Sequence, residues 1–248
     1  QTRKNLRIGE FDAIENMRDF CERLLGIPIV QCELPNEIAG ATILNGNSRG
    51  IVVNTKGSNQ NVWIRRATLA HEIGHLLWDP KGRLGSLCVD NYIGIESDAR
   101  SVPDYIEQRA NAFSVEFLAP LGGVFQTFKL HSDSRDGLRA VMERFGVSFA
   151  VDRYQVWHAH DRSFPIETLQ VEDNTPTPDW VGRESFTTDF FPIRETPVNR
   201  KGLFCGVVRK AEAENLISED TAATYLESTI TKYREEKTAI QDFFPHTK

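Results

Sequence analysis

The five residues from His71 to His75, in the order His-Glu-Ile-Gly-His, constrain the fold of this chain more than any other feature. In an α-helix, positions i and i+4 lie on the same face, so the two imidazoles can reach one metal ion. Glu72 lies beside that face, where its carboxylate can take a proton from a water that the metal activates. The pattern therefore predicts a helix that carries two metal ligands and a general base.

The residues around this pattern are those of a helix packed against a core. Apolar side chains recur at helical spacing, namely Ile64, Ala67, Ala70, Ile73, Leu76 and Leu77. Asp79-Pro80 predicts that the helix ends at Trp78. Gly74 costs a helix roughly 1 kcal/mol relative to alanine, which makes sense if another part of the chain must approach the helix closely. The alternative, a core helix with two incidental histidines, fits this setting less well.

Two histidines leave a tetrahedral zinc ion short of a protein ligand, and Glu107 is the best candidate for the third. It lies in a second predicted helix, with Pro103 in the first turn and Pro120 after the end. The apolar stripe of this helix consists of Ile106, Ala110, Phe113 and Phe117. Glu107 lies at the edge of the stripe, so its carboxylate can point into the seam with the first helix. A solvated glutamate is the usual alternative, and spacing alone does not separate the two.

Two stretches of the chain resemble the signature sequences of the ImmA/IrrE family of metallopeptidases. The first is Arg-Arg-Ala-Thr-Leu-Ala-His-Glu-Ile-Gly-His at residues 65 to 75. The second is Glu-Gln-Arg-Ala-Asn-Ala-Phe at residues 107 to 113, followed by Phe-Leu-Ala-Pro at residues 117 to 120. The resemblance covers about residues 30 to 120 and departs at Ser114, where the family more often has a small apolar residue.

The resemblance implies that Glu107 completes a Zn²⁺ site with His71 and His75, while Glu72 serves as the catalytic base. It also implies an α+β fold, in which a zincin-like metallopeptidase core of helices carries a small antiparallel sheet. The implied activity is that of a zinc metalloendopeptidase, which hydrolyses peptide bonds.

The family's activity implies a protein substrate, a helix-turn-helix transcriptional repressor whose cleavage derepresses stress-response or phage-defence genes. It further implies an activating ligand, with single-stranded DNA as one candidate. Two alternatives stay open: a non-catalytic module in which the metal braces a DNA- or protein-binding surface, and a small-molecule zinc hydrolase. Retention of Glu72 disfavours the first, because a structural metal site needs ligands but no base. The second would need a closed pocket, which the sequence does not reveal.

Composition and charge favour a cytoplasmic enzyme. The 248 residues have a net charge of -6, which gives no general attraction to nucleic acid. No apolar run is long enough to span a bilayer, so we expect no membrane partner. The four cysteines are scattered without a Cys-x-x-Cys pair, which argues against a disulfide scaffold and indicates a reducing compartment. Arg65 and Arg66 are interpreted as solvent-facing charges on a helix rather than as a nucleic-acid patch.

We expect two regions. Residues 1 to 165 are predicted to form the metallopeptidase domain, and residues 166 to 248 a mostly helical accessory or regulatory region, with a polar, proline-rich linker at residues 172 to 179. The tail shows two helical patterns, and Ser218 is a natural N-cap for the last helix. The chain starts at Gln1 rather than at Met, so we expect residues to precede it, and many chains of the family carry a DNA-binding helix-turn-helix there.

Within the first region, residues 10 to 25 have the apolar spacing of a helix. Residues 41 to 44 and 51 to 54 predict a strand pair around an Asn-Gly-Asn-Ser turn, and its edge could bind an extended peptide. Two further helices are predicted between residues 136 and 159. Their spacing resembles a helix-turn-helix, but a packing role is the favoured interpretation.

A hydrolytic site also needs a hydrogen-bond donor for the tetrahedral oxyanion. The candidates are Tyr92, Tyr105, His158 and His160, and the sequence does not rank them. His158 and His160 are two positions apart rather than four, so we expect them to bind no metal.

Cys88 lies between the two halves of the predicted site. A thiolate is a strong zinc ligand and could fill the fourth position, displacing the water that Glu72 must activate. Cys88 is therefore a candidate inhibitory metal ligand. The alternative is a small buried hydrophobic residue, which is the common state of a free cysteine.

Overall fold

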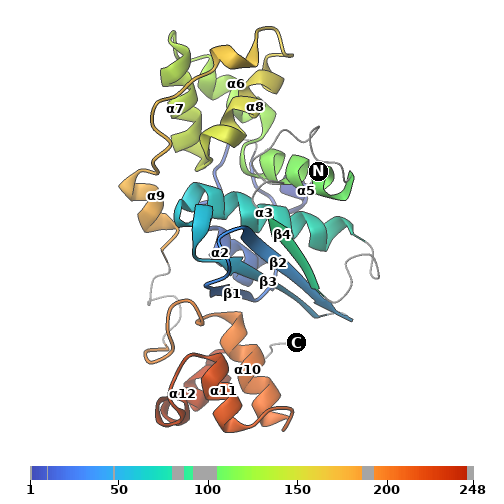
Figure 1. Ribbon diagram of the computed structural model, residues 1–248, viewed down its shortest axis with the longest axis vertical. Coiled ribbons are helices and arrows are strands. Elements are labelled where there is room, and N and C mark those ends of the chain that lie inside the picture. Colours follow the sequence, from blue (N-terminus) through green and yellow to red (C-terminus); the bar gives the residue numbers. More distant parts are fainter. Residues whose placement is uncertain are drawn as a thin grey trace.

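The computed structural model describes residues 2–9, 11–46, 48–79, 87–91, 105–185 and 193–244 (Figure 1). The fold is α+β, as expected. The long helix α3 (Val62–Trp78) packs between a four-stranded sheet and helix α5 (Tyr105–Leu118). Further helices lie at the two ends of this central unit, above and below it in Figure 1. Within the described residues, no helix combines the length and the apolar character needed to cross a membrane.

The sheet has the order β1-β3-β2-β4 among the described strands. These strands are β1 (Ile29–Cys32), β2 (Ile38–Asn45), β3 (Ser48–Asn54) and β4 (Leu87–Asn91). β2 and β3 form the expected antiparallel pair, and Gly46 takes a φ of 61° in the turn, where glycine is unstrained. The sheet is mixed rather than antiparallel throughout, since β1 runs parallel to β3. The parallel pair arises because β3 inserts between β1 and β2, which run in opposite directions.

α3 ends at Trp78, as predicted, and begins with Asn61, whose side chain accepts a hydrogen bond from a first-turn amide. The helix is buried along most of its length because the sheet covers one side and α5 the other. A Cβ on Gly74 would lie 3.1 Å from the Phe113 ring and 3.2 Å from Ala110 Cα. The close approach expected at Gly74 is therefore confirmed, and the approaching element is α5.

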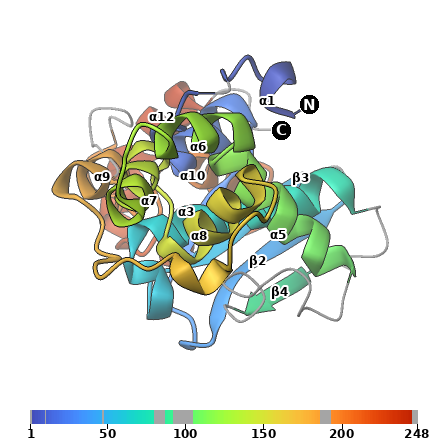
Figure 2. The ribbon, with the colours of Figure 1, turned by 90° about the horizontal axis from the view of Figure 1, so that it is seen from above.

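Three helices follow: α6 (Leu121–Phe128), α7 (Ser134–Phe145) and α8 (Phe149–Ala159). The helices predicted between residues 136 and 159 are thus confirmed, and Gly146 joins them with a φ of 63°. All three pack on one another and contribute to the same hydrophobic core as α3. Figure 2 shows these helices grouped together when the molecule is seen from above.

The helix predicted at residues 10 to 25 is shorter than expected. After α1 (Thr2–Asn5), the regular structure resumes at Asn16, whose side chain accepts from Asp19 N and caps α2 (Met17–Asp19). The chain continues as a π-helical turn, η1 (Phe20–Leu24). The prediction was wrong because Ile14 is buried in the core but lies outside any helix. Its apolar side chain therefore fitted the helical spacing by chance.

Arg66 is fully buried, whereas a solvent-facing charge was expected. Its guanidinium pairs with Glu184 and donates to the carbonyl oxygens of Gly146 and Phe145. The Trp180 ring lies beneath it, with its centroid 4.3 Å from Cζ. A buried charge needs such pairing and hydrogen bonding. Arg66 therefore ties α3 to the chain that follows α7 and to the region after residue 165.

The region after residue 165 contains more helices than predicted. They are the short turn η4 (Ile166–Thr168), α9 (Pro178–Arg183), α10 (Leu203–Ala213), α11 (Glu219–Tyr225) and α12 (Ile230–Phe243). Ser218 caps α11 rather than the last helix, and Thr229 caps α12. α10 to α12 have a hydrophobic cluster of their own, whereas Trp180 of α9 packs with Trp63 of α3. The division at residues 165 and 166 stays a prediction.

A buried ion pair between α2 and η1 lies against the chain that leads into α10. Arg18 Nε lies 3.7 Å from Glu22 Oε2, and both side chains are almost inaccessible. Arg18 also donates to the carbonyl oxygens of Val198 and Lys201. Gly202, with a φ of 107°, leaves room for the Glu22 carboxylate, because a Cβ at this position would clash with it. These contacts hold α10 against the central unit.

We expect Glu22→Gln to flatten the pH dependence of stability. Burial raises the pKa of Glu22 from 4.5 to about 7, against the lowering effect of Arg18. A carboxyl with a raised pKa in the folded state stabilises fully below its unfolded pKa, and this contribution is lost as pH rises through about 7. The wild-type free energy of unfolding should therefore fall, relative to the variant, by up to about 1.4 kcal/mol per pH unit in that window. Urea unfolding at several pH values measures this, and parallel curves for the two proteins would contradict it.

Candidate metal centre

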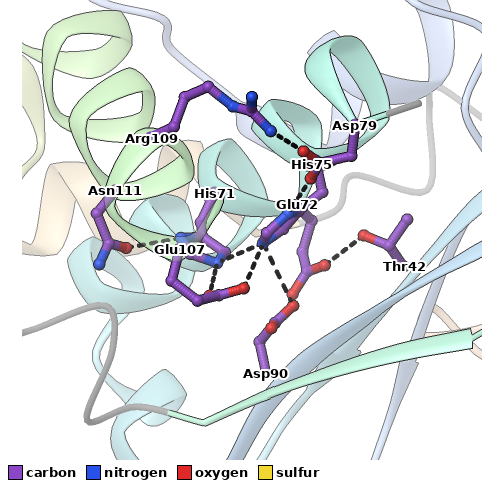
Figure 3. Close-up of polar contacts among 9 residues, drawn as sticks. All are labelled: Thr42, His71, Glu72, His75, Asp79, Asp90, Glu107, Arg109 and Asn111. Atoms are coloured by element: carbon purple, nitrogen blue, oxygen red, sulfur yellow. Dashed lines mark hydrogen bonds and ion pairs between the residues drawn. The ribbon is translucent and has the colours of Figure 1, made fainter. Parts of the chain in front are cut away.

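The two histidines of α3 meet at their Nε2 atoms. These atoms of His71 and His75 lie 2.9 Å apart, and both side chains are fully buried. The rings make an angle of 74°, and Figure 3 shows both directed toward one place. The same-face geometry expected for positions i and i+4 is present.

α5 brings Glu107 to this place from the facing helix. Its Oε2 lies 3.3 Å from His71 Nε2, and its Oε1 lies 3.6 Å from His75 Nε2. The side chain is 24% exposed, so it points into the seam between α3 and α5 rather than into solvent. Hydrogen bonding to His71, and then to His75, lowers the pKa of Glu107 to about 2. The carboxylate is therefore ionised at neutral pH, as a metal ligand must be.

Asp90 of β4 joins this group, although its sequence context predicts no metal ligand there. It is buried, and its Oδ2 lies 3.8 Å from His75 Nε2. One ligand atom each from His71, His75, Asp90 and Glu107 lies within 4.8 Å of the other three. No local pattern marks Asp90, because it reaches the site only through the pairing of β4 with β2.

Each histidine is oriented by a partner at its other ring nitrogen. His71 Nδ1 lies 2.7 Å from Asn111 Oδ1, and His75 Nδ1 lies 2.6 Å from Asp79 Oδ2. Because both partner atoms are acceptors, each Nδ1 donates, so a neutral imidazole that binds a metal ion here would offer the ion its Nε2 lone pair in place of a hydrogen bond to Glu107. Arg109 donates to the other oxygen of Asp79 and holds it in place. The nitrogen and oxygen donors thus fit a bound metal ion, with the supporting partners that such sites use.

We expect Asn111→Ala to weaken metal binding by roughly 10- to 100-fold, the usual effect of removing a partner behind a metal-binding histidine. His71 would lose the acceptor that fixes its tautomer. Asn111→Asp keeps an oxygen acceptor and is the matched control, which should bind at least as tightly as the wild type. Competition with a chromophoric chelator measures the affinities. Equal affinities for the alanine variant and the wild type would show that Asn111 does not support the site.

Glu72 is fully buried and faces the same group (Figure 3). Thr42 of β2 donates to its Oε2, and a side-chain hydrogen bond joins Glu72 to Asp90. Burial, followed by the charge of Asp90, raises the pKa of Glu72 well above its ordinary value. Gly40 of β2 makes room for Glu72, since a Cβ there would lie 2.8 Å from Oε1. One oxygen of Glu72 is therefore held by Thr42, and the carboxylate lies against Asp90 at the edge of the histidine group.

The described candidates for oxyanion binding do not contact this group. Tyr105 is 84% exposed at the start of α5. His158 and His160 lie at the end of α8, where His158 contacts Trp157 and His160 contacts aromatic rings of α6. The donor for the oxyanion therefore has no assignment within the described part of the chain.

Two further candidates fall outside what the structure describes. The backbone of Cys88 lies in β4 opposite Thr42, but its side chain is outside the described residues. Tyr92 is outside them altogether. The role of Cys88 as an inhibitory ligand stays a prediction.

A family model described as the IrrE N-terminal-like domain, of the Peptidase M78 family, matches residues 23–156. This span is more than half of the 248 residues. It contains α3, β4 and α5, the three elements that supply the group around the histidine pair. No curated protein matches the sequence at a significant level.

Proposed function

The chain belongs to the IrrE N-terminal-like, Peptidase M78 family, and from this membership and the geometry of the centre we propose that it is a zinc-dependent endopeptidase. In this proposal, His71, His75 and Glu107 hold the metal ion and Glu72 is the general base. The substrate is a helix-turn-helix transcriptional repressor, whose cleavage derepresses stress-response or phage-defence genes. The reaction takes place in the cytoplasm.

The observation that carries the proposal is the position of Glu72 beside the convergent Nε2 atoms. A metal site that only braces a fold needs ligands but no base. A second buried carboxylate next to such ligands destabilises the fold unless it is compensated, because burial disfavours its charge. A non-catalytic module that binds DNA or protein would have no use for this arrangement. We therefore favour catalysis over this alternative.

The metal would supply a Lewis acid that activates water and polarises the scissile carbonyl, and two imidazoles with one carboxylate suit zinc. Glu72 would accept a proton from the attacking water and later deliver it to the leaving amine. A cation at the ligand atoms favours the ionised form of Glu72 and offsets the burial that raises its pKa. The hydrogen bond from Thr42 keeps the carboxylate in one orientation.

β4 is the element along which we expect an extended peptide to bind. It stands at the end of the described strand order, beside β2. Val89 on this strand is 48% exposed, and the next residue, Asp90, lies in the candidate metal group. A peptide that adds to such an edge gains backbone hydrogen bonds and would pass close to Glu72.

The proposal is tested by mixing the purified chain and Zn²⁺ with the repressor encoded next to its gene. We expect a single cut in the repressor with the wild type and none with Glu72→Gln. A parallel reaction with single-stranded DNA tests whether this ligand activates the enzyme. An intact repressor in every wild-type reaction, with zinc bound, would reject this substrate class.

We expect low basal activity against unfolded generic substrates such as casein. A protease that cuts a cytoplasmic regulator must be restrained until a signal arrives, so it should be selective. Casein digestion followed by gel electrophoresis measures this, with Glu72→Gln as the blank for contaminating proteases. Rapid and unselective digestion by the wild type alone would point to a housekeeping peptidase instead.

A further inference from the structure

A centre with three protein ligands and a general base does not account for the position of Asp90. Its side chain is 6% exposed, and its Oδ2 lies 3.8 Å from His75 Nε2. Figure 3 shows its carboxylate beside Glu72, on the side of the histidine pair away from Asn111. Two neighbouring buried carboxylates repel each other unless a cation or a proton lies between them. Asp90 and Glu72 therefore either share a proton or lie beside a cation.

The local backbone directs Asp90 to the centre. In the register of β2 with β4, Asp90 pairs with Gly40, and the next pair is Asn91 with Ile38. The extra residue on β2, Ala39, makes an irregularity next to Asp90. Such bulges re-aim a side chain and are frequent beside active sites. Gly40 also provides the space that Glu72 occupies, so one position of β2 shapes the surroundings of both carboxylates.

Building on the ligand set proposed above, we propose that Asp90 is a fourth protein ligand of the metal and closes the resting centre. One ligand atom of Asp90 lies within 4.8 Å of those of His71, His75 and Glu107. Catalytic zinc sites have three protein ligands and one open position, whereas sites with four protein ligands are closed. With Asp90 in place, the centre offers no position for the water that Glu72 would deprotonate.

The closed centre opens when Asp90 moves with β4. This strand stands at the end of the described strand order, so a peptide that pairs with it acts directly on the backbone of Asp90. A substrate that fits β4 would thus release its own hydrolytic site, while a poor fit would leave the site closed. Selectivity would then come from the strand that carries the fourth ligand.

The test compares the wild type with Asp90→Ala and Asp90→Asn, using the full chain and the metal alone. Zn²⁺ affinity is measured by chelator competition, and we expect both variants to bind at least about 10-fold more weakly, since loss of a supporting partner alone costs this much. The matched control is Asp152→Asn, which alters a fully buried carboxylate on α8 outside the metal group and should leave the affinity unchanged.

The second readout is access of a small ligand to the metal. With Co²⁺ bound, the visible spectrum of the wild type should not respond to azide, because no position is open. The spectra of both Asp90 variants should shift when azide is added. Neither readout involves peptide cleavage, so the result stands even if the chain proves not to cut any repressor.

Two outcomes would overturn the proposal. Unchanged Zn²⁺ affinity in both Asp90 variants would show that Asp90 does not contact the metal and instead shares a proton with Glu72. An azide response in the wild type equal to that of the variants would show that the centre is already open. Circular dichroism establishes that each variant is folded, and Asp90→Asn, which keeps the side-chain volume, serves if the alanine variant is not.

Discussion

Glu72→Gln should retain full metal binding and lose peptidase activity by roughly 10²- to 10⁴-fold, the contribution typical of a positioned general base. Glutamine has the same shape, and its amide oxygen can still accept the hydrogen bond that Thr42 donates to Glu72. It cannot take a proton from water. The change should therefore remove one chemical step while leaving the surroundings of His71 and His75 as they are.

The measurement pairs a cleavage assay on the repressor with metal analysis of the same samples. Glu236→Gln is a suitable control, since Glu236 is another buried glutamate but lies on α12 and outside the metal group. It should keep the wild-type rate at saturating metal. If Glu72→Gln cleaves within a few-fold of the wild type, Glu72 is not the base. If it also loses its metal, the variant has disturbed the site and the rate says nothing specific about proton transfer.

The parts of the site that lie within one helix could be predicted from the sequence. His71, His75 and Glu72 belong to one helical turn, and their relative positions follow from helical geometry. Gly74 lies in the same helix, and a glycine inside a helix predicted that another part of the chain packs closely there. The sequence did not identify Phe113 and Ala110 as the neighbours. Glu107 is different, because its spacing left two interpretations open and the resemblance decided between them.

The parts that depend on tertiary pairing could not be predicted. Asp90 lies on β4, and the register of β4 against β2 places it at the candidate metal centre. The residues near it in sequence form no pattern that predicts this position. Asp79 is an intermediate case, since it follows His75 by four positions but lies just after the last helical residue, where helical spacing no longer applies. Arg66 looked like a surface charge because its partner, Glu184, is 118 residues away.

The predicted helix boundaries were wrong where buried residues outside a helix happened to follow helical spacing. Ile14 is buried in non-helical chain, so the apolar spacing of residues 10 to 25 suggested a longer helix than the structure has. In the tail, Ser218 caps a helix that ends at Tyr225, and a new helix begins at Ile230. Ser218 is an N-cap, as predicted, but of α11 and not of the last helix, because a cap is a local hydrogen bond whereas the length of a helix is set by packing.

Glu107→Ala should weaken zinc binding by at least about 100-fold, because it removes an ionised ligand and not only a partner behind one. Hydrogen bonding to His71 and His75 keeps the pKa of Glu107 at about 2, so the wild-type carboxylate is charged whenever the protein is near neutral pH. Its loss leaves two imidazoles and Asp90 at the centre. Two nitrogen donors and one carboxylate can still bind zinc, so some affinity should remain.

The zinc affinity that remains in Glu107→Ala separates the contribution of Asp90 from that of Glu107. If Asp90 is a ligand, the double variant Glu107→Ala/Asp90→Ala should bind zinc more weakly than Glu107→Ala alone. Because both side chains would contact the same ion, the two losses need not add. Metal analysis after dialysis against a chelator, together with competition titration, gives both affinities. Full zinc occupancy with unchanged affinity in Glu107→Ala would remove Glu107 from the site and would leave Asp90 as the third ligand.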